Sequence, residues 1–246
     1  ECNERQIGSI NGIKAFPNLE ALYLHNKQFC DISALASLTQ LKTLDLGWGS
    51  RCIRDIEPLS GLRNLDWLNL RGNNVSDLAP LANHPRLREL QIGHNAIDSF
   101  SSLGLLNALT YLQADGNSLS SPSLEGFPQL RNLGLNSIGI SDLAPLVSTL
   151  IGPLEYLGLN DNAIADFSPL NGLQNLRGID AQNNNVRILS LRDLPKLNRV
   201  RIQRSGIQQV DLENTPELFE FDLGGNNLAD ISSLADFMAA QPNPNN

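Results

Sequence analysis

Few residues of this chain have the types and spacing that catalysis or metal binding requires. The three histidines are His25, His84 and His94, and none belongs to a visible Ser/His/Asp set. The chain also lacks zinc-type spacing, a glycine-rich phosphate loop and a repeated carboxylate column. The cluster Asn160-Asp161-Asn162 offers oxygen ligands, but without repetition in adjacent units a turn is the better interpretation. We therefore expect no enzyme, no metal site and no cofactor.

The elements that would position any site come from a leucine pattern that restarts about every 22 residues. One unit reads Leu65-x-x-Leu68-x-Leu70-x-x-Asn73-x-Val75-x-x-Leu78-x-x-Leu81. This change of apolar period from two to three predicts a short strand, a tight turn and a convex return segment. Ten units begin at Leu19, Leu41, Leu65, Leu87, Leu109, Leu130, Leu154, Leu176, Leu197 and Leu218. One unit cannot bury its apolar side alone, so stacked coils must share a core.

Four return segments share an Asp, Pro and Leu signature. They are Asp55-Ile56-Glu57-Pro58-Leu59, Asp77-Leu78-Ala79-Pro80-Leu81, Asp142-Leu143-Ala144-Pro145-Leu146 and Asp166-Phe167-Ser168-Pro169-Leu170. With these segments, residues 7–237 resemble the 22-residue class of the leucine-rich repeat superfamily, which includes bacterial internalins and the regulatory subunit of the type-1 protein phosphatase. The resemblance implies a curved, right-handed α/β repeat solenoid with a parallel concave β-sheet and 3-10 or irregular convex segments.

We expect a single domain. It would cover residues 1–240, with a partial coil at 1–18 and ten coils at 19–240, before a polar tail at 241–246. Residues 235–240 could close the last coil as a short helix, and Cys2 falls on a strand core position. The start at Glu1 fits a mature secreted protein as well as an excised domain.

A recurrent asparagine follows the strand in six coils. These residues are Asn73, Asn95, Asn117, Asn162, Asn184 and Asn226. By analogy with the family, we expect each inward amide to donate to unpaired carbonyls of its own coil and the next. Four coils have another residue at this position, namely Lys27, Gly49, Ile138 and Ser205. Those coils should be less regular, the second most of all, because two extra residues fall between Leu46 and Ile53.

Alternate residues of each predicted strand point to the concave face. All three tyrosines and Trp67 fall in these outward columns, and Trp48 lies just past the second strand. Rings with a polar handle suit an interface that must stay soluble, so we interpret them as partner contacts. The alternative is that they pack against each other along the sheet.

Charge on this face is segregated. Arg199 and Arg201, with Arg204, form a basic group on the ninth coil. Asp180 flanks this group on one side and Glu220 and Asp222 on the other, while Asp45 and Asp115 are acidic residues near the aromatics. Partner recognition and neutralisation between adjacent strands explain this pattern equally well.

The middle of the face is nearly bare, because Gly134, Gly158 and Gly178 lie on successive strands. A ridge on a partner could approach the backbone there, or the small residues could set the curvature of the sheet.

Cysteine placement bears on the compartment. Cys30 follows the inward Phe29 and Cys52 precedes the inward Ile53, so the two flank one core column on adjacent coils. They could form a disulfide if the extra loop residues shift the backbone. Such a pair favours a secreted or cell-surface protein, with a cytoplasmic location as the alternative.

Composition limits the function classes. A net charge of −8 and a pI near 4.8 argue against nucleic-acid binding, and no apolar stretch is long enough for a membrane span. We expect a monomer that binds a protein on its concave face, and the internalin likeness implies a secreted or surface bacterial protein. The alternatives are a cytosolic phosphatase-regulating adaptor and a carbohydrate or cell-wall binding module. The residues predicted to contact the partner are Tyr23, His25, Trp48, Trp67, Arg71, Tyr111, Asp115, Tyr156, Arg199, Arg201 and Arg204.

Overall fold

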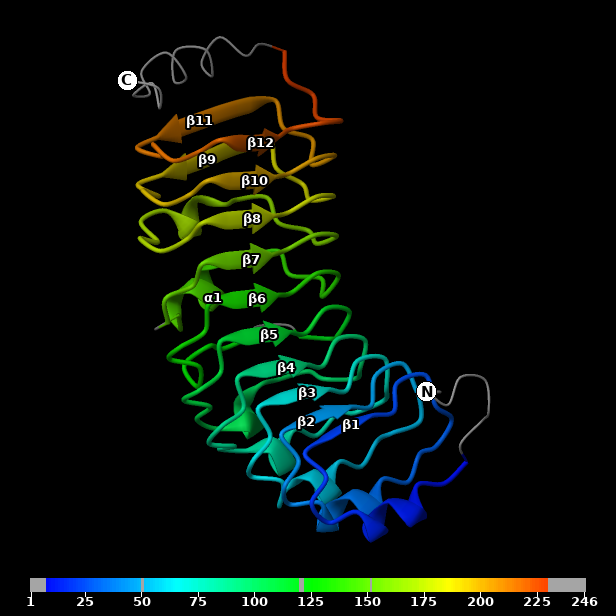
Figure 1. The fold of residues 1–246 in the computed structure, drawn as a ribbon. Helices are drawn as coiled ribbons and strands as arrows, with labels where there is room; N and C mark the ends of the chain where they lie inside the picture. The colour runs from blue at the N-terminus through cyan, green and yellow to red at the C-terminus, as the bar shows by residue number, and fades with distance from the viewer. Residues whose placement is uncertain (1–7, 50, 120–121, 151, 230–246) are drawn as a thin grey trace.

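The computed structural model describes residues 8–49, 51–119, 122–150 and 152–229, which form a solenoid of stacked coils (Figure 1). Ten parallel strands make one sheet in chain order. They are β1 (Ala21–Tyr23), β2 (Thr43–Asp45), β3 (Trp67–Asn69), β4 (Glu89–Gln91), β5 (Tyr111–Gln113), β6 (Asn132–Gly134), β7 (Tyr156–Gly158), β8 (Gly178–Asp180), β10 (Arg199–Arg201) and β12 (Glu220–Asp222). Each begins two residues after the leucine that opens its unit, so the predicted solenoid is confirmed.

The core is a continuous column of aliphatic side chains. The central residue of each strand pairs with the central residue of the next, as Leu44 does with Leu22 and Leu68. All three are buried, because a strand of period two sends its middle residue inward. Phenylalanines such as Phe127 and Phe167 enter this core, but no tyrosine or tryptophan does.

Short helical turns return the chain on the convex side of most coils. They are the 3-10 segments η1 (Asn11–Ala15), η2 (Ser33–Ser37), η3 (Glu57–Leu59), η4 (Ala79–Leu81), η5 (Ser101–Leu103) and η6 (Ser168–Leu170), with one α-helical turn, α1 (Ala144–Ser148). The signature aspartate accepts a hydrogen bond from the N–H two residues later, as in Asp55 with Glu57 and Asp142 with Ala144, both at 2.8 Å. It therefore satisfies a backbone donor that has no partner inside the helical turn.

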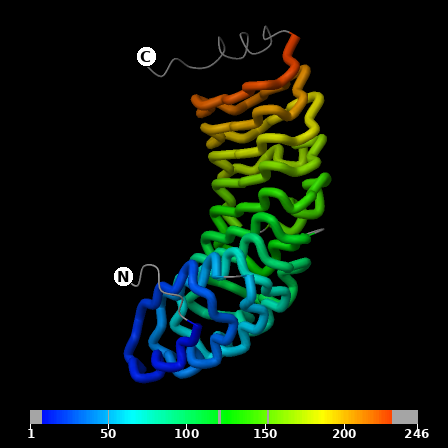
Figure 2. The backbone as a smooth tube through the Cα atoms, turned by 90° about the vertical axis from the view of Figure 1, so that its right-hand side faces the viewer, coloured from blue at the N-terminus to red at the C-terminus, as the bar shows by residue number. Residues whose placement is uncertain are grey.

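Two returns differ from the expected convex form. Strands β9 (Ile188–Arg192) and β11 (Gln209–Glu213) replace the helical turns and pair in parallel as a second, two-stranded sheet. Buried Leu189 and Leu191 alternate with outward residues, which is the strand period. The coils here are paired on both sides, and in Figure 2 this end of the tube runs straight while the blue and cyan coils bend away.

The asparagine column is confirmed as a structural ladder, with one correction. The Asn184 amide donates to Ala181 O (2.9 Å) in its own coil and to Leu159 O (3.0 Å) in the preceding coil, not the next. Its Oδ1 accepts the Ile164 N–H at 3.0 Å, again from the preceding coil. Ser205 substitutes with its hydroxyl, which donates to Ala181 O at 3.3 Å.

The expected irregularity of the second coil leaves a mark on this ladder. Asn73 keeps both donations, to Leu46 O (2.9 Å) and Leu70 O (3.0 Å). Its buried Oδ1, however, meets no hydrogen-bond donor among the described residues. The junction between the second and third coils is therefore less completely bonded than its neighbours.

Three expectations concern residues outside the described part of the chain: the core position of Cys2, the closing helix at 235–240 and the tail at 241–246. Across the described residues, no helix has the length and apolarity that crossing a bilayer would need.

Candidate binding surface on the concave sheet

One residue per coil, immediately before the asparagine column, adopts the left-handed conformation. This turn column consists of Asn26, Trp48, Gly72, His94, Gly116, Ser137, Asp161, Asn183, Arg204 and Gly225, all with φ between 53° and 70°. Its N–H groups extend the sheet hydrogen bonding by one rung, as Trp48 N donates to Arg71 O at 2.6 Å. Glycine, asparagine and aspartate favour this conformation, whereas large side chains are uncommon there. Trp48, His94 and Arg204 are therefore the unusual members.

Each unusual member is followed by glycine in the next coil. A Cβ at Gly72 would lie 2.5 Å from the Trp48 ring, and one at Gly116 would lie 2.5 Å from the His94 ring. A Cβ at Gly225 would lie 3.0 Å from Arg204 Cγ. The large side chains thus lie flat on the turn of the next coil, where glycine leaves the space that a Cβ would fill.

Trp48, Arg71 and His94 meet at the end of strands β2 to β4. The Arg71 guanidinium lies 5.2 Å from the Trp48 ring centre, within cation–π range. Its Nη2 is 3.2 Å from His94 Nε2, and the rings of Trp48 and His94 are 5.5 Å apart between centres. Trp48 remains 47% exposed. We name these three residues the Trp48 cluster.

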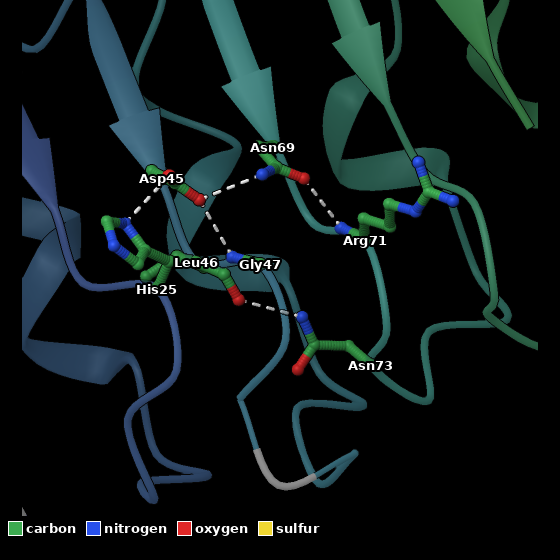
Figure 3. A network of polar contacts seen from close by, with 7 residues as sticks. All are labelled: His25, Asp45, Leu46, Gly47, Asn69, Arg71 and Asn73. Carbon is green, nitrogen blue, oxygen red and sulfur yellow. Dashed lines mark hydrogen bonds and ion pairs between the residues drawn. The ribbon is translucent and has the colours of Figure 1, made fainter.

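A polar network fixes the backbone beneath this cluster (Figure 3). The Asp45 carboxylate accepts from Gly47 N (3.0 Å) and Asn69 Nδ2 (2.9 Å) and lies 3.1 Å from His25 Nδ1. Asn69 Oδ1 in turn accepts the Arg71 N–H at 2.9 Å. In Figure 3 the Arg71 side chain points away from the network. Asp45 and His25 are thus paired with each other, while the Arg71 guanidinium is not part of the network.

Two of the predicted aromatic contacts lie toward the N-terminal end. Tyr23 is 60% exposed, and Trp67 is half-buried on the same face. Both line a shallow hollow with Thr43, Asp66, Arg88 and Glu89. The aromatic surface therefore begins at the first strand and continues to the Trp48 cluster.

The bare middle of the face is a second shallow hollow. Its floor includes Gly134 and Gly158, and Tyr111 and Tyr156 stand on its walls. Burial, followed by the nearby charges of Asp115 and Glu89, raises the pKa of the Tyr111 phenol, which therefore stays neutral near pH 7. A glycine-floored surface with two neutral rings is thus available in the middle of the sheet, and Asp180 and Arg199 also line it.

Asp115 lies beside this hollow but is buried. Its carboxylate accepts from the backbone N–H and the side-chain amide of Asn136, each at 2.9 Å, and from Gln113 Nε2 at 2.8 Å. Asp115 therefore positions its neighbours, and little of it faces solvent.

The arginines of coil nine are largely paired within the face. Arg199 lies 3.7 Å from Asp180 and 5.7 Å from the Tyr156 ring centre, and Arg201 donates to Glu220 at 2.6 Å. The Tyr156 ring lies over Gly178, and it fits there because glycine has no Cβ, which would come within 2.7 Å of the ring. Arg204 is exposed and has no acidic partner among the described residues.

The structure thus joins Trp48 with Arg71 and Tyr156 with Arg199, at two separate places on the face. Sequence reasoning assigned no role to His94, Asn69 or Gly72. A signal existed, since Trp48, Gly72 and His94 each lie seven residues after the leucine that opens their unit.

The remaining candidates for chemistry have structural roles. Cys30 and Cys52 form a disulfide with a Cα–Cα distance of 5.1 Å, joining the first two coils. His84 is fully buried, and burial, with the charge of Arg63, lowers its pKa below the ordinary value. Within the described residues, no group of three His, Cys, Asp or Glu side chains could hold a metal ion.

Comparison with known proteins agrees with this architecture. The family model for leucine-rich repeats in two copies matches residues 63–104. Adenylate cyclase of Schizosaccharomyces pombe is 30% identical over 191 residues, 73% of this chain, but the chain spans only 11% of that protein. Human lumican is 29% identical over 245 residues, 90% of this chain and 71% of lumican. The crystal structure of an internalin, InlF, from Listeria monocytogenes superposes with a TM-score of 0.67 at 25% identity, covering 94% of this chain and 82% of InlF.

Proposed function

Because the chain is a leucine-rich repeat protein, we propose that it acts without catalysis, by binding a protein partner on its concave face. The aromatic residues carry this proposal. All five tryptophans and tyrosines lie on the concave sheet or its rim, and the core holds none of them. A purely structural use of these rings would have placed some of them inside.

The contact surface that we propose has two parts. The first holds Tyr23, Trp67 and the Trp48 cluster, and the second holds Tyr111 and Tyr156 around the glycine floor. Large rings at the centre of an interface tend to dominate its energy, since they bury much area at low entropy cost. Arg199 and Arg201 are already paired, so their part would be to steer the encounter.

We further propose that the protein is secreted or displayed on a bacterial surface, as an internalin-like protein. Its fold matches InlF over most of both chains, and a disulfide within a leucine-rich repeat domain is typical of an oxidising compartment. Lumican and adenylate cyclase share repeat units with this chain, but their own activities are not assigned to it.

The test begins with capture of a partner from host and bacterial surface extracts by the intact protein. It continues with the purified protein and the purified partner. In calorimetry, Trp67→Ala and Tyr111→Ala should each weaken binding by at least about 2 kcal/mol. Their unfolding midpoints should stay near that of the parent protein, because neither ring fills the core.

Two variants serve as controls. Leu105→Ala removes an apolar side chain that is 48% exposed away from the concave sheet, and Asp98→Lys changes an exposed charge of a return segment. Both should leave affinity unchanged. Loss of the partner in these variants, with retention in the aromatic ones, would refute concave-face binding. If the protein binds glycans on a glycan microarray and only the aromatic variants lose that binding, a carbohydrate ligand replaces the protein ligand.

A further inference from the structure

Arg71 is an arginine of the concave face that has no counterion. Arg199 pairs with Asp180 and Arg201 with Glu220, but no carboxylate pairs with Arg71 among the described residues. Its neighbours in the same outward column on adjacent coils are Gly47 and Gly93, which provide no side chain. The nearest described acidic network, at Asp45, is already bonded to His25, Gly47 and Asn69.

The guanidinium is nevertheless held in place. It lies against the Trp48 ring and touches His94 Nε2, and both rings are seated on glycines of the following coils. Both rings also belong to residues in the left-handed conformation, with φ of 58° at Trp48 and 54° at His94. Such conformations are costly for large side chains and tend to persist where geometry serves a function. Positioning without a counterion is what a receptor for an anion requires.

One part of the guanidinium is open. Arg71 Nε is buried without a partner and Nη2 meets His94, whereas Nη1 donates to no described residue and is not buried. A planar fork of this kind recognises compact oxyanions better than a lysine would.

We propose that the Trp48 cluster is an oxyanion receptor, in which Arg71 binds a carboxylate, sulfate or phosphate group on the partner. This rests on the proposed concave-face binding and names the chemistry that the N-terminal part of that face recognises. His94 orients the guanidinium, because its Nε2 accepts a hydrogen bond from Arg71 Nη2 at 3.2 Å.

The other charged groups of this region do not neutralise Arg71. The Asp115 carboxylate is held by Gln113 and Asn136. Asp45 is occupied by His25. Glu89 is exposed on β4 and makes no ion pair among the described residues.

The experiment uses the protein without any partner. All variants also carry Trp67→Phe, so that Trp48 is the single tryptophan. Its fluorescence is titrated with sodium sulfate, phosphate or acetate in the millimolar range, with sodium chloride added to keep ionic strength constant. We expect a saturable change of the Trp48 fluorescence at about pH 7.5.

Variants assign the response. Arg71→Gln should abolish saturation, and His94→Ala, which removes the ring that contacts the guanidinium, should weaken binding. Arg54→Gln removes an exposed charge of the second coil and should change nothing. Saturation by acetate indicates an acidic side chain as the partner group, and saturation by sulfate or phosphate alone indicates a modified one.

Absence of saturation with all three salts, or equal saturation in Arg71→Gln, would overturn the proposal that the Trp48 cluster binds an oxyanion. Because no partner is present, that result would leave the proposed binding function untouched. Conversely, failure of Trp67→Ala and Tyr111→Ala to weaken partner binding would count against the proposed function without affecting the anion titration.

Discussion

The asparagine ladder allows a stability comparison between two sites of equal burial. Asn184 and Asn73 are 5% and 4% exposed. Replacing Asn184 by Ala removes three hydrogen bonds. It leaves the Ile164 N–H without a side-chain partner, whereas Ala181 O keeps the Ser205 hydroxyl and Leu159 O keeps the Asn162 amide. At about 1–3 kcal/mol for the unpaired N–H and about 1 kcal/mol for each of the other lost bonds, the free energy of unfolding should fall by about 3–5 kcal/mol.

The same change at Asn73 should cost less. Leu70 O keeps the Asn95 amide as a donor, so only Leu46 O is left without a side-chain partner, and the substitution also removes an Oδ1 that already lacks one. We expect about 1–3 kcal/mol. Urea unfolding followed by circular dichroism measures both, provided that the dependence of stability on urea is the same in each variant.

Asn185→Ala is the matched control, because this neighbour of Asn184 is exposed, and its effect should stay within about 0.5 kcal/mol. A loss at Asn73 as large as the loss at Asn184 would show that counting unpaired groups does not explain the stability of the ladder.

Three further predictions concern the core, the buried histidine and the disulfide. Leu135→Ala, at a fully buried position, should lower the unfolding free energy by about 2–5 kcal/mol in the same urea assay, because the cavity lies between coils that cannot collapse. Burial lowers the pKa of His84, so as pH falls below about 6.5 the unfolded chain binds a proton that the folded chain does not, and stability decreases. Urea midpoints between pH 7 and pH 5 should therefore fall in the parent and fall less in His84→Leu, and equal slopes would exclude His84 as the cause. Alkylation of the denatured chain without reductant should modify one cysteine of three, and reduction should cost about 3 kcal/mol for a loop of 22 residues, whereas three modified cysteines would show that the disulfide is absent.

The strands were predictable because their signal is local and repeated. An apolar residue, most often leucine, at positions one, four and six of each unit fixes which residues of a three-residue strand face the core, and the outward residues follow from that. The second sheet was missed although Leu189 and Leu191 alternate correctly, because the family likeness suggested helical or irregular returns everywhere. In these two returns the Asp and Pro signature is absent and the strand period decides the conformation.

The Trp48 cluster could not be derived from the sequence. Its formation depends on the left-handed backbone at Trp48 and His94 and on the direction in which their rings lie, over the next coil. Nor does spacing show that Asp115 is buried, since its outward column predicts exposure and the hydrogen bonds from Asn136 and Gln113 hold its carboxylate against the sheet. Pairing of Arg201 with Glu220, in contrast, was one of the two explanations that the charge pattern offered.

The alternation of large residue and glycine in the turn column limits how such an array can grow by duplication. If the coil of Trp48 alone were copied, the second tryptophan would take the place of Gly72, where a Cβ would already lie 2.5 Å from the first ring. We therefore expect coils two and three, four and five, and nine and ten to be duplicated or engineered as pairs. Single coils can be inserted or deleted between Ser137 and Asn183, where small polar residues follow one another in the column. Lineages of this array should differ in length there, and designed extensions belong at the same junctions.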